Sequence, residues 1–325
     1  MVRNGAARQC VVLSTLAMLA SCAAWAGELP TPVEPAPTVT GSAGLFRLST
    51  AEVGDARRLR LAVFGELSRA SDFLVFGDTN TKIAGNVAAG LAVHRHVELF
   101  AAVRAAWNRN HVNATPASDA SVSTIGSGGF SVGAKAATQI ARAWAGGVEI
   151  GARLPFAAGS WPSSGAAWID VLASFDLTAL APVPLRVHGS GGFYADGSRN
   201  QIDFAGQSAT ARQVALFAHG MGSSRIRASL GLDAPIERWT GRLGLRPFAE
   251  YHHELITAQP DPALSDQTPY YTDQVWVTLG LHARAGAGVT LLAGADIGVG
   301  AVGFPYGPPL APWNAFAGAS RALPF

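Results

Sequence analysis

The longest regular pattern in the sequence is an alternation of apolar with polar or small residues that runs through 81–110. Ile83, Val87 and Leu91 share one parity of the first arm, and the second arm repeats the pattern after a tight turn at 94–96. Successive side chains of a β-strand point to opposite faces. The stretch therefore predicts a hairpin with one apolar face and one polar or small face.

The length of these two arms limits where such a hairpin can be stable. Each arm holds about a dozen residues, whereas strands of soluble sheets usually hold about 5–6. A tilted strand that crosses a bilayer needs about 9–11 residues. A half-buried sheet of a soluble protein is the alternative, and we disfavour it because the same pattern recurs along the chain.

The recurrence predicts an all-β fold, a transmembrane antiparallel up-and-down β-barrel of about twelve strands that occupies 44–325. From Arg57 onward the alternating segments succeed one another, and the last covers 312–324. Ten and fourteen strands are the alternatives, since bacterial single-chain barrels have even counts. Gly44–Val53 would be a thirteenth strand, so we expect a lead-in strand on the periplasmic or lumen side. Alternation is weakest in 205–224, to which we assign no structure.

The connections between these segments alternate in length. Short ones fall at 94–96, 139–142, 178–184, 235–241 and 286, and long polar ones near 69–79, 109–122, 157–164, 195–211, 255–272 and 303–311. Short turns on one side and long loops on the other are typical of outer-membrane barrels. We therefore expect the long loops to lie outside the cell.

Closure of the barrel decides which parity faces the lumen. An open sheet edge leaves backbone groups unpaired in hydrocarbon, and an Arg or Lys on lipid at mid-depth costs roughly 2–4 kcal/mol. The charged parity is therefore expected to line the lumen. Its members are Arg58, Arg60, Glu66, Lys82, Glu98, Arg104, Lys135, Glu149, Arg153, Asp170, Asp176, Arg186, Arg227, Asp233, Arg242, Arg246, Glu250, Arg284 and Asp296.

These inward charges predict a salt-bridged lumen. Charges of both signs at neighbouring inward positions are expected to pair across strands, which would resist large solutes. Eleven of the residues are basic and eight are acidic, an excess of three positive charges. Any pore should therefore weakly prefer anions. Complete pairing of the arginines, with no net field on the axis, is the alternative.

Aromatic residues mark the two ends of the outward faces. We expect Trp107, Phe156, Phe193, Tyr251 and Trp313 at the long-loop ends, and Trp144, Trp239 and Phe325 at the short-turn side. Amphipathic rings prefer the headgroup level of a membrane. This distribution predicts two aromatic girdles.

Residues 1–26 have the features of an export signal. A short basic region precedes an apolar stretch that is too short to span a membrane as a helix, and Ala24–Ala26 forms an A-x-A site before Gly27. We expect cleavage between Ala26 and Gly27. The alternative is lipidation at Cys22, because residues 19–22 also match a bacterial lipobox. The Pro-rich stretch that follows predicts an extended linker over 27–43.

Composition and motifs argue against catalysis and nucleic-acid binding. The formal net charge is +2 and only 14% of the residues are charged, so we expect no nucleic-acid partner. The glycines at 298–303 precede no helix, which excludes a dinucleotide site. The best catalytic-looking cluster is His252-His253-Glu254, but neighbouring strand residues point to opposite faces. We expect no enzyme, no cofactor and no metal site.

A family resemblance supports this interpretation. The segments GLFRLSTAEVG, LRLAVFGE, AGLAVHRHVELFAAV and GGFSVGAKAA resemble the N-terminal barrel of OmpA-like outer-membrane proteins of the myxobacterial type. Many members of that group add calcium-binding repeats and a periplasmic peptidoglycan-binding domain. We expect neither here, so anchoring to the cell wall is not implied.

Three functional hypotheses remain for a protein of the Gram-negative outer membrane. The first is a porin-like conduit for small solutes or ions with a mixed-charge lumen. The second is a non-conducting structural or adhesive barrel that displays extracellular loops, and the third is a hydrolase at the outer rim. The expected partners are outer-membrane lipid, the barrel assembly machinery and small solutes or ions. The sequence does not indicate an oligomeric state.

Overall fold

The protein is described from a computed structural model of the 325-residue chain. The described residues are 35–72, 77–112, 121–156, 165–180, 183–197, 217, 224–236, 244–257, 273–285, 288–299 and 310–325. Twelve long strands dominate them: β3 (Arg58–Ser71), β4 (Asp78–His94), β5 (Val97–Val112), β6 (Ser121–Ala141), β7 (Trp144–Pro155), β8 (Ala166–Asp176), β9 (Arg186–Asp196), β10 (Arg225–Asp233), β11 (Leu245–Ile256), β12 (Gln274–Arg284), β13 (Val289–Gly298) and β14 (Trp313–Pro324).

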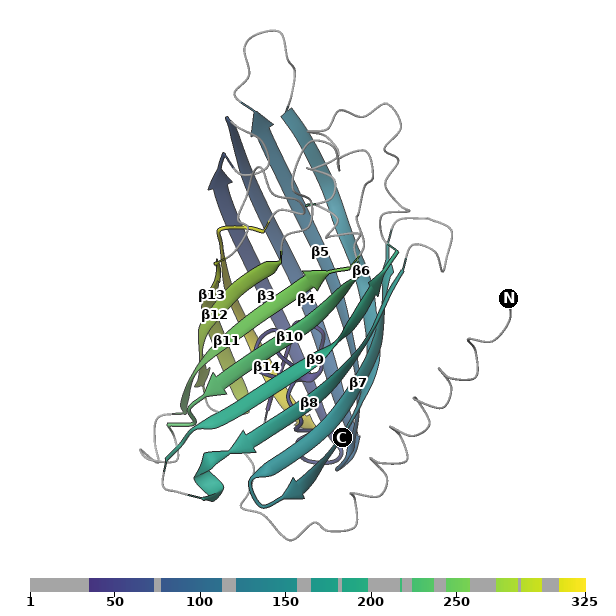
Figure 1. Cartoon of the computed structure of the whole chain (residues 1–325), viewed down its shortest axis with the longest axis vertical. Helices are drawn as coiled ribbons and strands as arrows, with labels where there is room; N and C mark the ends of the chain where they lie inside the picture. Colours follow the sequence, from purple (N-terminus) through teal and green to yellow (C-terminus); the bar gives the residue numbers. More distant parts are fainter. Residues whose placement is uncertain are drawn as a thin grey trace, which may run out of the picture.

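These strands form one closed antiparallel barrel (Figure 1). Each strand pairs with its neighbours in the sequence, and β14 closes the barrel on β3 from Ala315↔Leu67 to Pro324↔Arg58. Every strand thus has a partner on both sides, which removes the open edges that hydrocarbon would not tolerate. The predicted fold class and the count of twelve strands are confirmed.

The connections divide the barrel into two ends. At one end the strands are joined through 95–96, 142–143, 177–185, 234–244 and 285–288, and at the other through longer stretches such as 197–224 and 257–273. A 3-10 helix, Leu177–Ala179, lies in the short-turn end, where the Asp176 side chain accepts a hydrogen bond from the Thr178 backbone N–H. Strands β3 to β6 rise higher toward the long-loop end than the rest of the wall (Figure 1).

The two faces of the wall differ as the alternation predicts. Outward side chains are large, apolar and exposed, for example Val63, Val87, Ile150, Val171 and Leu230. Exposed aromatic residues stand near the strand ends, among them Trp144 at the short-turn end and Phe156 at the other. An apolar surface that surrounds a whole barrel far exceeds the patches that soluble monomers expose.

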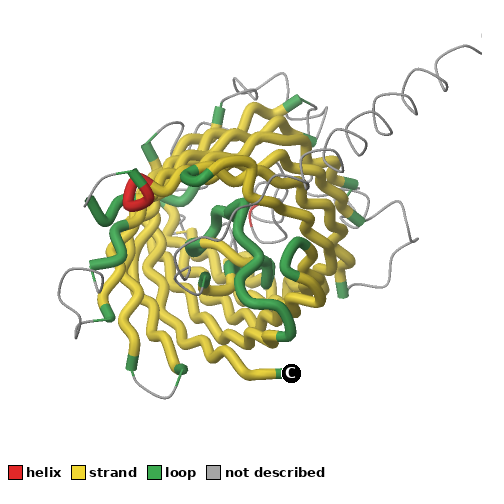
Figure 2. Tube along the Cα trace, turned by 90° about the horizontal axis from the view of Figure 1, so that it is seen from below, coloured by secondary structure: helices red, strands yellow, loops and turns green. Residues whose placement is uncertain are grey.

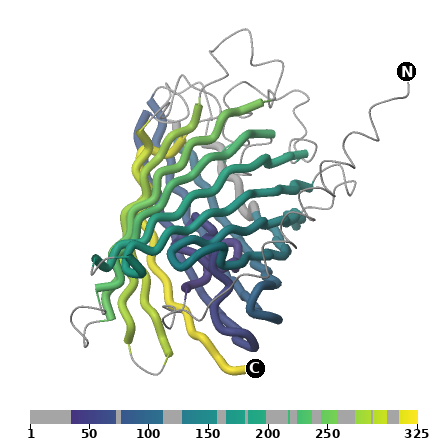
Figure 3. The backbone as a smooth tube through the Cα atoms, turned by 60° about the horizontal axis from the view of Figure 1, so that its bottom comes forward, coloured from purple at the N-terminus to yellow at the C-terminus, as the bar shows by residue number. Residues whose placement is uncertain are grey.

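The lumen contains a folded N-terminal segment, residues 35–56, which we call the plug. Figures 2 and 3 show it inside the ring of strands, near the short-turn end. Two short strands, β1 (Ala36–Pro37) and β2 (Ala43–Gly44), pair with each other within it. The sequence predicted an extended linker over 27–43, of which 27–34 lie outside the described residues. Residues 35–43 fold inside the lumen, where the polar wall of the barrel supplies partners for their backbone.

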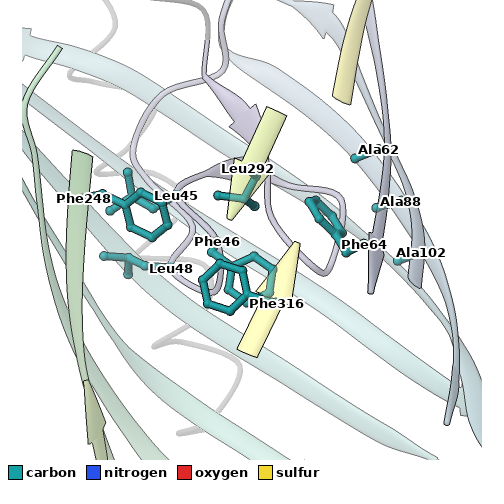
Figure 4. Packing of buried hydrophobic residues seen from close by; sticks show 10 residues of the cluster. All are labelled: Leu45, Phe46, Leu48, Ala62, Phe64, Ala88, Ala102, Phe248, Leu292 and Phe316. Atoms are coloured by element: carbon teal, nitrogen blue, oxygen red, sulfur yellow. The ribbon is translucent and has the colours of Figure 1, made fainter. Parts of the chain in front are cut away.

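The plug has a small apolar core of its own against the wall. Leu45, Phe46 and Leu48 pack with Phe64, Phe248, Leu292 and Phe316 (Figure 4). The rings of Phe46 and Phe316 are stacked, with centroids 3.7 Å apart. The stretch expected to be a lead-in strand therefore lies on the lumen side, as compact loops rather than as a strand.

Glycines on the inner wall make room for these aromatic side chains. A Cβ at Gly133 would lie 2.2 Å from Phe100 Cζ, and one at Gly280 would lie 2.3 Å from Phe248 Cζ. A Cβ at Gly151 would likewise lie 2.2 Å from Trp168 Cζ2. Each ring thus covers a glycine of the neighbouring strand and lies against the wall, an arrangement that stabilises glycine in a sheet.

Candidate functional site in the plugged lumen

Near the short-turn end, the carboxylate of Glu98 on β5 holds the first part of the plug. Glu98 forms buried salt bridges with Arg60 (2.5 Å) and Lys135 (2.9 Å). Its two oxygens also accept from the Ala43 backbone N–H at 3.1 Å, and Lys135 Nζ donates to the Ala43 carbonyl at 2.8 Å. Arg60 further donates to the carbonyl of Val53 at 2.8 Å. Three wall residues therefore bind two separate points of the plug backbone.

A second wall carboxylate, Glu250 on β11, binds the apolar tip of the plug. It accepts from the backbone N–H groups of Phe46 (2.7 Å), Arg47 (3.1 Å) and Leu48 (3.2 Å). Its other oxygen lies 2.9 Å from His252 Nε2. Successive N–H groups that converge on one carboxylate form an anion-binding nest, and here the anion comes from the barrel wall.

The Arg47 side chain extends from the plug to wall strands on the same side of the barrel as β11. Its guanidinium bridges Glu66 on β3 (2.7 Å) and Asp296 on β13 (2.5 Å). Burial by itself lowers the pKa of Arg47, but Asp296 and Glu66 raise it by more, so the pKa lies above its ordinary value. Glu66 is shared with Arg104, which donates to it at 3.0 Å.

A third wall cluster holds the last part of the plug. Arg186 pairs with Glu52 of the plug (2.8 Å) and with Asp233 of β10 (2.8 Å). Asp233 also binds Arg246 and lies 2.7 Å from His188 Nε2. A neighbouring contact adds to this cluster, because Ser174 Oγ lies 2.8 Å from His188 Nδ1 and accepts from the Ala51 N–H at 3.0 Å.

Beyond the plug, toward the long-loop end, the inward charges pair within the wall. Arg227 binds Asp170, and Trp168 Nε1 donates to Glu149 at 3.1 Å. Arg225 lies 2.9 Å from Glu254, and its guanidinium carbon stands 4.1 Å from the ring centroid of Tyr194. The contacts of Trp168 and Arg225 join neighbouring strands, whereas the Arg227–Asp170 pair spans β9 to link β10 with β8.

The remaining predicted lumen residues lie nearer the barrel ends or on the β4 and β7 wall. Arg58 and Arg284 are at the short-turn end, where Arg58 pairs with Asp55 at 3.5 Å. Asp176 caps the 3-10 helix, Arg153 is half-buried on β7, and Lys82 Nζ donates to the Phe217 carbonyl at 3.1 Å. Arg242, Trp239, Cys22, Ala26 and Gly27 lie outside the described residues.

The plug and the inward aromatic residues were missed at the sequence level. The apolar run at 44–48 was visible, but a Pro-rich stretch before it suggested a linker. Phe64, Phe100 and Phe248 stand at inward positions, where they interrupt an otherwise polar parity. That interruption, with glycines on the neighbouring strands, was the available signal.

The histidine cluster divides between the two faces of β11. His252 is buried in the lumen, lies 2.8 Å from Ser229 Oγ and stacks on Trp276, whereas His253 is partly exposed and lies 2.9 Å from Asp273. Ser229, His252 and Glu250 thus form a connected series. Because Glu250 already accepts three plug N–H groups, we assign this series to holding the plug.

No group of three or more His, Cys, Asp or Glu side chains among the described residues is arranged to hold a metal ion. Within the same residues, no helix has the length and apolar character needed to cross a membrane.

Comparison with known proteins gives structural similarity only. No family model and no curated protein matches the sequence. An outer membrane channel from Pseudomonas putida F1 aligns at 12% identity and a TM-score of 0.49, covering 84% of this chain and 98% of that one. The NanC porin aligns at 12% identity and a TM-score of 0.45, covering 81% of this chain and 100% of that one. The beta domain of a Bordetella autotransporter aligns at 14% identity and a TM-score of 0.43, covering 83% of this chain and 100% of that one.

These similarities are too distant to transfer a solute or an activity. They do not show the OmpA-like type of the myxobacteria, which stays a prediction from the sequence. The site must therefore be interpreted from the residues of this chain.

Proposed function

We propose that the protein is a conduit for small solutes or ions in the bacterial outer membrane, and that its own plug closes the lumen in the state described here. The observation that carries the proposal is that wall carboxylates and cations hold the plug mainly through its backbone and through Arg47 and Glu52. The apolar outer surface and its aromatic ends support a membrane location, with outer-membrane lipid as the surrounding partner.

The polar character of the lumen favours a conduit over a barrel built only for stability. Buried ion pairs contribute little net stability, and well-packed apolar residues of similar volume are often as stable or more so. A purely structural barrel would therefore gain nothing from lining its interior with Arg60, Glu98, Lys135, Arg186 and Asp233. A wall that must accept water and ions once the plug leaves needs such groups.

The export signal of residues 1–26 and insertion by the barrel assembly machinery belong to this proposal. So does the orientation, with the long connections outside the cell and the plug at the periplasmic end.

A second candidate function, a non-conducting barrel that displays its loops, is favoured by one observation. The plug backbone is bound at several separate points, so the lumen is filled near the short-turn end. The two functions predict different results when the plug is removed: a conduit would then conduct ions, whereas a structural barrel would stay closed.

Planar-bilayer recording of two proteins tests the proposal. The wild type and a variant that lacks 36–53 are refolded, and heat-modifiable gel migration verifies that both barrels have formed. We expect rare, small openings from the wild type and a large, steady conductance from the deletion variant. A folded deletion variant that stays closed would support the structural barrel, and a wild type that conducts like a general porin would refute closure by the plug.

A further inference from the structure

We infer that the lumen carries a binding site for a small hydroxylated carboxylate, formed by Lys82, Arg104 and Asn108 just beyond the plug. The inference rests on the proposed function, because it names the class of solute that the conduit would take.

The three residues form one inward patch on two neighbouring strands. Lys82 of β4 and Asn108 of β5 are direct partners in the strand register. Arg104 precedes Asn108 on the same face of β5, and Ala102 below it packs against the plug core. The side chain of Arg104 is 41% exposed, so solvent reaches the patch although Lys82 and Asn108 are more enclosed.

The charge around this patch is positive. Lys82 interacts electrostatically with Arg104, Arg153 and Arg47, and among its main interactions only Glu66 has the opposite charge. Glu66 itself is bound by both Arg47 and Arg104. An enclosed site with this balance attracts anions, because a fixed positive potential acts strongly within low-dielectric walls.

Asn108 provides an independent sign of a ligand. Its side chain is buried, yet neither its amide nitrogen nor its amide oxygen has a hydrogen-bond partner among the described side chains, which do not include those of 121–127. Two residues further along β5, the Asn110 amide nitrogen also lacks a partner among the described side chains, although its amide oxygen accepts from Asn80 Nδ2 at 3.3 Å. Buried amides are normally satisfied, so this pair fits a ligand that offers both acceptors and donors.

The present partner of Lys82 shows which kind of atom the lysine takes. The Lys82 ammonium donates to the Phe217 carbonyl at 3.1 Å and stands 4.4 Å from the centroid of the Phe217 ring. A carboxylate oxygen is a stronger acceptor for an ammonium than a neutral carbonyl, because the hydrogen bond is then between charged groups. A hydroxy carboxylate would replace the Phe217 carbonyl and would offer its hydroxyl groups to Asn108.

Isothermal titration calorimetry on the refolded full chain tests the site with glucuronate and glucose. These two probes differ in a carboxylate against a hydroxymethyl group, so the comparison isolates the charge. We expect glucuronate to bind and glucose to bind at least about tenfold more weakly, since a hydrogen bond between charged groups is worth about one factor of ten or more. Arg104→Gln and Asn108→Ala should each weaken glucuronate binding, the former by about tenfold or more.

Arg227→Gln is the matched control, because Arg227 is also an inward arginine but pairs with Asp170 on another part of the wall. It should leave glucuronate affinity unchanged. If Arg104→Gln fails to fold, Asn108→Asp keeps the side-chain size and should abolish binding by adding a negative charge.

The inference would be overturned if glucuronate and glucose bound equally well. It would also be overturned if Arg104→Gln or Asn108→Asp bound glucuronate as tightly as the wild type, or if Arg227→Gln lost as much affinity as Arg104→Gln. Calorimetry does not depend on conductance. If deletion of 36–53 opens the pore while glucuronate does not bind, the conduit stands and only this site is refuted.

Discussion

Replacing Glu250 with alanine should release the tip of the plug. The substitution removes the acceptor of the Phe46, Arg47 and Leu48 N–H groups and the partner of His252 Nε2. Leaving a buried donor without a partner costs about 1–3 kcal/mol, so three donors together lose roughly 3–6 kcal/mol once relaxation is allowed for. Since about 1.4 kcal/mol is a factor of ten, the docked state should become about 100-fold or more less populated relative to the undocked state.

Single-channel recording measures this change as open probability. We expect Glu250→Ala to open far more often than the wild type, with the same conductance as the variant that lacks 36–53. Glu149→Ala is the matched control, because Glu149 is also a buried inward carboxylate but accepts from Trp168 on the wall. An open probability of Glu250→Ala that equals that of the wild type, while the deletion variant conducts, would refute the role of Glu250.

Three other predictions concern the wall and its orientation. Gly133→Ala should lose about 1–3 kcal/mol of unfolding free energy in urea, because its Cβ would overlap Phe100 and the Ile150 carbonyl, whereas Gly85→Ala, where nothing lies within 4 Å, should change little. Val171→Arg, in mid-strand on the outer face, should lower the stability of the barrel in lipid by roughly 2–4 kcal/mol, whereas Val93→Arg, near a strand end, should lower it by about 0–1 kcal/mol. Titrations of folding into vesicles measure both effects, and equal effects would contradict the membrane position of β8. A protease site inserted within 257–272 should be cut on intact cells and one at 94–96 should not, and the reverse pattern would invert the orientation.

The alternation of the sequence was sufficient to predict the barrel wall. Because side chains of a strand alternate between its faces, residues such as Leu61, Val87 and Val171 could be assigned to the outer face from their parity alone. The recurrence of alternating segments led to the count of twelve strands, and backbone pairing in hydrocarbon then required the sheet to close. These are local properties repeated along the chain, so no long-range contact was needed to infer them.

The contents of the lumen could not be predicted in the same way. Glu98 and Ala43, or Glu250 and Phe46, are far apart in the sequence, and their contacts depend on the bore of the closed barrel. The parity rule placed Glu98, Glu250 and Arg186 on the inner face but could not say that their partners would be the plug. Only the tertiary structure decides this, because a short segment without periodicity folds where the wall satisfies its backbone, and the wall exists only once the barrel has closed.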